Sequence, residues 1–368
     1  MKENRKVKIC FFSGDITRSG GTERVAIQIA NELQKQGKYS ISFVSLYEGH
    51  QEVFFELDRN IVRYQLYNTI VSGKTHFLGY IYRLKKIVES NALDILVDID
   101  GIIDIYSVPV KWITGVKVIS WEHFNYYFHP TQKFRQKVRK FAVKNVNAIV
   151  TLTEQDKRYY LENLRIPCLI YAIYNPIIFS EKNNIYNEQS KILISVGRLT
   201  YQKGFDRLID VADIVLNNHM DWKWIVLGEG EDKELLQKKI ADKKLTGRLQ
   251  LLGNVKNVDE YYKKSSVFVM TSRFEGLPMT LLEAKNYKLP IVSYDIKTGP
   301  RECIQHGING YLVEDGNAKD MAEKIEKLIV DRDMRKDFSE KALMNVEKFS
   351  LEKIIYEWNK LIEEVMES

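Results

Sequence analysis

The sequence is poor in cysteine, and its N-terminus lacks an apolar run long enough to direct export. Its 368 residues contain three widely separated cysteines that form no CxxC pair: Cys10, Cys168 and Cys303. This pattern argues against a disulfide framework and against a zinc site. The basic start of the chain reaches Ser13-Gly14-Asp15 after a short apolar run, which is too short for a signal peptide or a membrane span. We therefore expect a cytoplasmic protein.

Acidic residues are missing from one stretch of the chain. The net charge is only +6, but no Asp or Glu lies between Glu122 and Glu154. The segment Tyr126 to Lys144 interleaves aromatic and basic residues: Tyr126, Tyr127, Phe128, Phe134 and Phe141 with Lys133, Arg135, Lys137, Arg139, Lys140 and Lys144. Such a segment could contact an anionic membrane surface or another polyanion. It could equally be a solvated helix face whose aromatic side chains join the core.

Strand and helix patterns alternate in both halves of the chain. A chain of this length predicts two domains, and the polar stretch Glu181 to Ser190 looks like a linker between them. The βα alternation predicts an α/β protein with two doubly wound parallel sheets, in which ligands bind beyond the carboxyl ends of strands. The expected strands are 7–12, 41–46, 61–66, 95–99, 116–120 and 148–152, then 192–196, 224–227, 249–252, 267–270 and 291–294.

The segment Phe274 to Glu283, FEGLPMTLLE, is the most informative motif. It follows a buried strand and places Glu275 before a Gly-Leu-Pro turn, a helix start near Pro278, and then Glu283. Free N–H groups at a helix N-terminus bind phosphate, and carboxylates accept hydrogen bonds from sugar and ribose hydroxyls. This order of groups suggests a nucleotide sugar as the ligand.

Two cations follow the first strand of the second half. Arg198 and Lys203 lie in a loop between a strand and a helix, where both could converge on a diphosphate, although they could also be ordinary surface cations. Gly20-Gly21-Thr22 opens the first helix of the chain, either for an anion or as an N-cap loop with Thr22 as the cap.

Three further patterns are less specific. His123 ends a strand, and a ligand role and a structural role are about equally favoured. Gly228-Glu229-Gly230 resembles the start of a dinucleotide fingerprint but lacks its third glycine, so we do not expect NAD to bind there. Asp98-Ile99-Asp100 could hold a divalent metal, but without a supporting carboxylate cluster we favour an ordinary strand end and expect no metal site.

Taken together, these segments resemble the retaining glycosyltransferases of family 4, which have the GT-B fold. FEGLPMTLLE matches the family's E-x7-E signature. The resemblance extends over nearly the whole chain through SGGTERVAIQIANEL, GRLTYQKGFD, IVLGEGEDKELL and LLGNVKNVDEYY. It implies two Rossmann-like domains, 1–180 on the acceptor side and 181–347 on the donor side, facing a central cleft. A C-terminal helix within 348–368 would cross back to the first domain.

The resemblance also implies roles for individual residues. Arg198 and Lys203 would hold the donor diphosphate, Glu275 would accept hydroxyls of the transferred sugar, Glu283 would bind the ribose, and His123 would reach the donor sugar. The remaining donor-binding residues would be Gly197, Gly253, Asn254, Val255, Gly276, Leu277 and Pro278, with Gly253 to Val255 contacting the base. Gly20, Gly21 and Thr22 would form the acceptor and phosphate loop.

The implied activity is retaining, metal-independent transfer of a hexose or N-acetylhexosamine in cell-surface polysaccharide synthesis. The donor would be a UDP-sugar, used as a substrate without a further cofactor. The acceptor would be a glycan or a polyprenyl-linked glycan at the inner face of the membrane, and nucleic acid would not be a partner. Two alternatives stay open: a GT-B UDP-sugar epimerase, and a non-catalytic subunit that binds nucleotide sugars.

Overall fold

The computed structural model describes residues 5–127, 133–179 and 186–368. The chain forms two compact units, which we call unit 1 (Met1–Pro176 with Leu351–Ser368) and unit 2 (Ile177–Ser350). The expected domain boundary at 180/181 and the first part of the expected linker lie outside the described residues. Residues 128–132 of the basic segment lie outside them as well.

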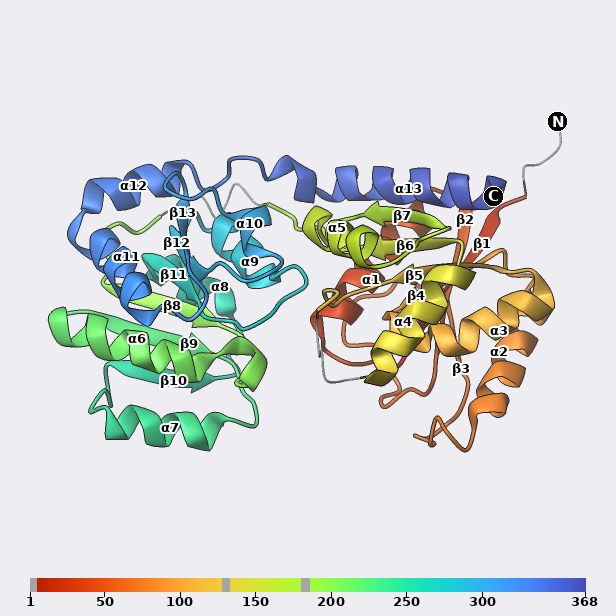
Figure 1. Cartoon of the computed structure of the whole chain (residues 1–368), viewed down its shortest axis with the longest axis horizontal. Coiled ribbons are helices and arrows are strands. Elements are labelled where there is room, and N and C mark those ends of the chain that lie inside the picture. The colour runs from red at the N-terminus through yellow and green to blue at the C-terminus, as the bar shows by residue number, and fades with distance from the viewer. Residues whose placement is uncertain (1–4, 128–132, 180–185) are drawn as a thin grey trace. The chain divides into compact units, whose positions relative to one another are not determined.

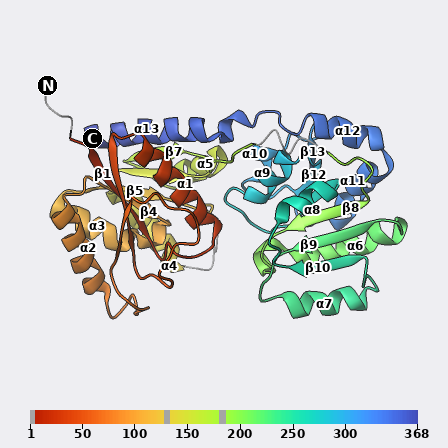
Figure 2. The same cartoon turned by 180° about the vertical axis from the view of Figure 1, so that it is seen from behind.

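Unit 1 is built on a seven-stranded parallel sheet with the order β3-β2-β1-β4-β5-β6-β7. Helices cover both of its faces (Figures 1 and 2). The strands are β1 Val7–Ser13, β2 Tyr39–Ser45, β3 Val62–Gln65, β4 Ile95–Ile99, β5 Lys117–Trp121, β6 Ala148–Thr151 and β7 Leu169–Ala172. The helices are α1 Gly21–Lys35, α2 Phe77–Asn91, η1 Gly101–Ile103, α3 Asp104–Thr114, α4 Lys133–Asn145, α5 Glu154–Asn163 and α13 Leu351–Glu367.

Unit 2 is built on a six-stranded parallel sheet with the order β10-β9-β8-β11-β12-β13. Its strands are β8 Ile192–Val196, β9 Lys223–Leu227, β10 Leu249–Gly253, β11 Val267–Met270, β12 Ile291–Tyr294 and β13 Gly310–Val313. Its helices are η3 Tyr201–Lys203, α6 Phe205–Asn218, α7 Lys233–Asp242, α8 Val258–Lys264, α9 Met279–Asn286, α10 Pro300–Cys303, α11 Ala318–Val330, α12 Arg332–Glu340 and η4 Glu347–Phe349.

The prediction of two doubly wound parallel sheets is confirmed. The central strands are continuous apolar runs because helices cover both faces of a parallel sheet. All five residues of β4 are buried, for example, and so are all four of β11. Two edge strands, β7 and β13, are absent from the sequence prediction.

The C-terminal helix α13 belongs to unit 1, although the whole of unit 2 separates it from the rest of unit 1 in the chain. Its apolar face is buried, and the Trp358 ring lies 4.9 Å from the Trp121 ring of β5. Complete burial of such a large side chain contributes on the order of 2–3 kcal/mol. At the polar margin the Tyr39 hydroxyl donates to Asn359 Oδ1 (2.9 Å). Within the described ranges, none of the helices has the length and apolar character that crossing a membrane requires.

Each sheet has one point at which the strand order reverses. In unit 2 this point lies between β8 and β11, which pair directly in the parallel sense although 70 residues separate them in the chain. In unit 1 it lies between β1 and β4. The loops that follow these strands diverge to opposite sides of the sheet and leave a crevice for a ligand at its carboxyl edge.

Candidate functional site

The two loops at the switch point of unit 2 carry several of the residues that the sequence predicts to bind a ligand. Gly197 and Arg198 come directly after β8, and Glu275 comes five residues after the end of β11. The backbone N–H of Leu199 donates to the Glu229 carbonyl (2.9 Å), which ties the loop after β8 to the loop after β9. Arg198 is exposed to solvent at this edge of the sheet.

Lys203 and Glu275 form an ion pair across the switch point. Lys203 Nζ lies 2.7 Å from Glu275 Oε1, and the two side chains are 20% and 7% exposed. The Ser272 hydroxyl donates to the same carboxylate oxygen (2.7 Å), and Gln202 Nε2 lies 3.4 Å from the other. A Cβ at residue 197 would lie 3.2 Å from Lys203 Cδ, so Gly197 makes room for the lysine stem. The fold thus brings together Lys203 and Glu275, which were both predicted to bind the nucleotide sugar.

The turn Gly276-Leu277-Pro278 leads into α9, as predicted. Leu277 and Pro278 are buried, and the Thr298 hydroxyl donates to the Glu275 carbonyl (2.5 Å), which fixes the start of the turn. Pro278 is the N-cap residue and provides no side-chain cap. The first-turn N–H groups of α9 are therefore the donors that a phosphate could use.

Glu283 lies within α9 and accepts a hydrogen bond from the Tyr262 hydroxyl (3.2 Å). The Tyr262 ring stacks on the Tyr287 ring, with 5.0 Å between the centroids. Burial, reinforced by the nearby Glu283 carboxylate, raises the pKa of Tyr262 well above its ordinary value, so the phenol remains a donor. The tyrosine therefore sets the orientation of the carboxylate that was predicted to bind ribose.

Gly253 ends β10, the edge strand two positions from β8, and Asn254 and Val255 follow it. Gly253 is buried, Asn254 is exposed and Val255 is half-buried. The Gly228 N–H donates to the Gly253 carbonyl (2.9 Å), so the loops after β9 and β10 are also tied together. The predicted base-contact loop lies on the same sheet edge as Arg198.

The glycine loop in unit 1 has a structural explanation. Gly20 is the N-cap of α1, and Thr22 lies inside the helix, so the alternative in which Thr22 caps the helix is wrong. A Cβ at residue 20 would lie 2.2 Å from Glu23 Oε2. Glu23 is buried in the first turn and pairs with Arg18. Glycine at position 20 therefore accommodates this carboxylate, while Gly21 is exposed at the start of α1.

His123 follows β5 in unit 1 and is buried against the Trp121 ring, with centroids 4.4 Å apart. Burial lowers the pKa of His123 to about 4, so the imidazole is neutral at physiological pH. Its Nε2 atom is buried and has no hydrogen-bond partner among the described residues. A neutral imidazole with an unsatisfied ring nitrogen suits hydrogen bonding to a ligand hydroxyl.

The basic segment is divided between two faces of α4, and two of its cations are not available to a membrane surface. Arg135 and Arg139 point inward and are buried. Arg135 makes a bidentate contact with Asp100 (2.6 and 2.9 Å), and Arg139 Nε donates to Glu122 Oε1 (3.3 Å). The aromatic residues Tyr126 and Phe141 are half-buried against the core of unit 1.

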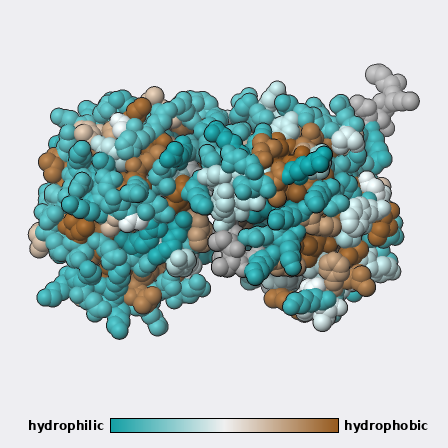
Figure 3. All heavy atoms as spheres, in the orientation of Figure 1, coloured by the Kyte–Doolittle hydropathy of each residue, from teal (hydrophilic) through white to brown (hydrophobic). Residues whose placement is uncertain are grey.

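The opposite face of α4 is exposed and cationic: Lys133, Lys137, Lys140 and Lys144. Phe134 is 59% exposed, and so is Trp112 at 61% near the end of the neighbouring helix α3. Figure 3 shows this side of unit 1, where hydrophilic and hydrophobic side chains lie next to one another over α3 and α4.

The two acidic residues at the end of β4, Asp98 within the strand and Asp100 just after it, do not converge. Asp98 is buried and accepts a hydrogen bond from Ser107, whereas Asp100 pairs with Arg135. Nowhere in the described ranges do three His, Cys, Asp or Glu side chains gather closely enough to hold a metal ion. The two carboxylates thus have separate structural partners.

Several further residues contact the predicted ones at this edge of the sheet in unit 2. Ser272 and Gln202 contact Glu275, Tyr262 contacts Glu283, and Arg273 bridges two loops. All lie within or beside the recognised motifs. From the sequence, these residues could be recognised only by their position within or beside the motifs, because their contacts arise from strand order.

Two family models together span most of the chain. Glycosyltransferase Family 4 matches residues 19–180, and Glycosyl transferases group 1 matches residues 177–343. An uncharacterized glycosyltransferase of Haemophilus influenzae is 32% identical over 355 residues, covering 96% of this chain and 99% of its own. The amylovoran biosynthesis glycosyltransferase AmsD of Erwinia amylovora is 29% identical over 367 residues, with coverage of 96% and 99%. The pneumococcal O-GlcNAc transferase GtfA, solved in complex with UDP and GlcNAc, has a TM-score of 0.81 at 15% identity, covering 99% of this chain and 100% of its own.

The two doubly wound units, together with these matches, show a glycosyltransferase of the GT-B type. The chain belongs to the glycosyltransferases: its first half matches the Glycosyltransferase Family 4 model, and its second half matches the Glycosyl transferases group 1 model.

Proposed function

We propose that this protein is a retaining, metal-independent glycosyltransferase that moves a hexose or N-acetylhexosamine from a UDP-sugar to a glycan or lipid-linked acceptor. The observation that carries the proposal is the Lys203–Glu275 pair at the switch point of unit 2, 2.7 Å apart and largely shielded from solvent. The UDP and GlcNAc bound by GtfA support the donor class, and the role of AmsD in amylovoran biosynthesis supports the process.

The proposed chemistry uses the charges of unit 2 for binding and for stabilising the leaving group. When a donor binds, Lys203 and Arg198 face its diphosphate, Glu275 accepts hydroxyls of the sugar, and Glu283 accepts those of the ribose. The bond from the anomeric carbon to the β-phosphate oxygen breaks, and a bond to the acceptor oxygen forms on the same face. The acceptor proton passes to the departing phosphate, and the two cations stabilise the charge that develops there.

A donor screen tests this proposal without knowledge of the acceptor. The thermal midpoint of the protein is measured with UDP, a panel of UDP-hexoses and UDP-N-acetylhexosamines, and GDP-mannose, each with and without EDTA. We expect the UDP compounds to raise the midpoint equally in both conditions, and Arg198→Ala to reduce the shift. No shift with any UDP compound would contradict the proposal.

Product analysis separates the transferase from its alternatives. Slow hydrolysis of a stabilising donor to free sugar and UDP, together with faster UDP release when an acceptor is present to receive the sugar, would support transfer. Release accompanied by a sugar with an inverted ring hydroxyl would favour the epimerase, and binding without any release would favour a non-catalytic subunit.

We also propose that the exposed face of α4 contacts the anionic inner surface of the cell membrane, which would place this cytoplasmic enzyme beside lipid-linked acceptors. Four lysines share this face, Phe134 is available for insertion, and no acidic residue interrupts the helix. Each such lysine near an anionic surface contributes about 1 kcal/mol.

The membrane proposal is tested by sedimentation with vesicles of phosphatidylglycerol and phosphatidylethanolamine. Lys137→Glu/Lys140→Glu should abolish salt-sensitive binding. The matched control Lys238→Glu/Lys244→Glu, at exposed sites of unit 2, changes the net charge equally and should bind as the wild type does. Equal binding by both variants would refute the proposal.

A further inference from the structure

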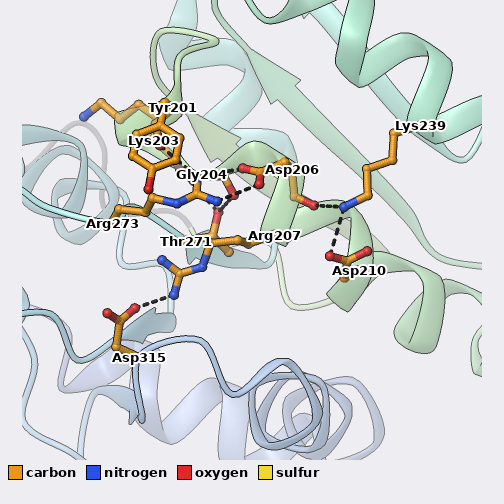
Figure 4. A network of polar contacts seen from close by, with 10 residues as sticks. All are labelled: Tyr201, Lys203, Gly204, Asp206, Arg207, Asp210, Lys239, Thr271, Arg273 and Asp315. Atoms are coloured by element: carbon orange, nitrogen blue, oxygen red, sulfur yellow. Dashed lines mark hydrogen bonds and ion pairs between the residues drawn. The ribbon is translucent and has the colours of Figure 1, made fainter.

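One arginine in unit 2 connects the two segments that carry Lys203 and Glu275. Arg273 lies in the loop after β11, and its guanidinium makes a bidentate contact with Asp206 in the first turn of α6 (2.8 and 2.6 Å). The same guanidinium donates to the Tyr201 carbonyl (2.9 Å) and stacks over the Tyr201 ring at 4.1 Å (Figure 4). Arg273 therefore contacts both ends of the segment that contains Lys203.

The backbones of the two segments are also joined directly. The Arg273 N–H donates to the Gln202 carbonyl (2.8 Å), and the Thr271 hydroxyl donates to the Gly204 carbonyl (3.0 Å). Gly204 has a φ of +64°, and a Cβ there would lie 2.3 Å from the Thr271 carbonyl oxygen. Only glycine permits this close approach, so the 201–206 and 271–275 segments are fitted tightly to one another.

The positive charge of Arg273 is neutralised by the Asp206 carboxylate. Its side chain is 19% exposed and both terminal nitrogens are engaged by Asp206, whose pKa is lowered mainly by the hydrogen bonds from Arg273. Asp206 also lies at a helix N-terminus, where a carboxylate is favoured. A phosphate would have to displace this carboxylate to bind Arg273, whereas Arg198 is exposed at the same sheet edge.

We propose that Arg273 and Asp206 act as a positioning clamp that sets the distance between Lys203, facing the diphosphate, and Glu275, facing the sugar. This inference rests on the proposed donor site. The clamp touches neither the phosphate nor the sugar. It acts by holding two loops in register, and small misplacements of reacting groups reduce rates strongly.

Unit 2 offers a matched control in Arg207, one residue beyond Asp206. Arg207 is 16% exposed, pairs with the single carboxylate of Asp315, and stacks over the Tyr294 ring at 4.3 Å. It resembles Arg273 in exposure and in partners. Its contacts lead toward the loop before α11, however, and do not join the two donor-binding segments (Figure 4).

The test compares Arg273→Ala, Arg273→Lys and Arg207→Ala with the wild type. The rate of UDP release from the donor found in the screen and the affinities for UMP and UDP are measured, and the thermal midpoint serves as a folding check. We expect Arg273→Ala to lower kcat about tenfold or more while its UMP affinity stays within about twofold, because UMP does not span the two segments. Arg207→Ala should keep the wild-type kcat. Arg273→Lys, which lacks the bidentate fork, should lie between them.

The outcomes distinguish the clamp from the donor site itself. Equal kcat values in Arg273→Ala and Arg207→Ala would overturn the clamp while leaving the proposed function intact. A wild type that neither binds UDP nor releases it from any donor would overturn both. If Arg273→Ala does not fold, Asp206→Asn provides the same comparison, and an unchanged kcat in that variant would refute the clamp.

Discussion

The Lys203–Glu275 pair makes a quantitative prediction about stability before any ligand is added. Lys203→Ala leaves a carboxylate that is 7% exposed without its cation. Removal of one partner from a fully buried pair costs about 3–5 kcal/mol. The cost here is reduced to about 2 kcal/mol, because Lys203 is itself partly solvated and Glu275 keeps the Ser272 hydroxyl at 2.7 Å. For a unit of this size, that loss lowers the thermal midpoint by roughly 4–8 °C.

Thermal unfolding of three variants checks this magnitude. Lys243→Ala breaks a lysine–carboxylate pair of similar length, 2.8 Å, whose side chains are 40% and 29% exposed, and should cost under about 1 kcal/mol. Lys203→Ala/Glu275→Gln also removes the negative charge that has lost its lysine, and should recover part of the loss. The reasoning is refuted if Lys203→Ala and Lys243→Ala lower the midpoint equally and the second substitution restores nothing.

Two further predictions concern hydrogen bonding and pH. Tyr262→Phe removes the hydrogen bond to Glu283 but keeps the ring, so titration calorimetry should show a UDP affinity lower by about three- to tenfold, and an unchanged affinity would contradict the proposed ribose role. His123 has its pKa lowered from 6.5 to about 4 by burial, so the folded state resists protonation and the protein loses up to about 3 kcal/mol of stability as the pH falls from 6.5 to 4. His123→Asn should lose less stability over that range in denaturant titrations, whereas parallel pH profiles would count against the buried neutral imidazole.

The central strands of both sheets could be predicted from the sequence because they are apolar runs rich in branched residues. The edge strands β7 and β13 could not be predicted in this way. Their four-residue sequences, LIYA and GYLV, have weak patterns, and all four residues of β7 are only half-buried. At a sheet edge, pairing with one neighbouring strand decides the conformation more than the local sequence does.

The parts of the proposed donor site could be predicted from the sequence, but their assembly could not. FEGLPMTLLE and the loop after β8 each indicated ligand binding from composition and position. The contact between Lys203 and Glu275, 72 residues apart, exists because β8 and β11 are neighbours. That neighbour relation follows from the strand order, which the sequence pattern does not specify.

The sequence of the basic helix α4 contains a signal that separates its arginines from its lysines. Arg135 and Arg139 are four residues apart and share a helix face with the buried Ala142, whereas the lysines recur on the other face. Helical spacing therefore predicts two sets of cations. Their partners, Asp100 and Glu122, come from strand ends that only the fold brings to α4.

The central claim is retaining transfer of a sugar from a UDP donor, and the anomeric configuration of the product tests it most directly. The protein is incubated with the α-configured UDP-sugar that stabilises it most and with acceptor lipids extracted from bacterial membranes, and the product is examined by NMR alongside UDP release. We predict an α-linked product formed in a one-to-one ratio with UDP, and at least tenfold less of it with Arg198→Ala. A β-linked product, or release of UDP that is insensitive to Arg198→Ala, would contradict the account.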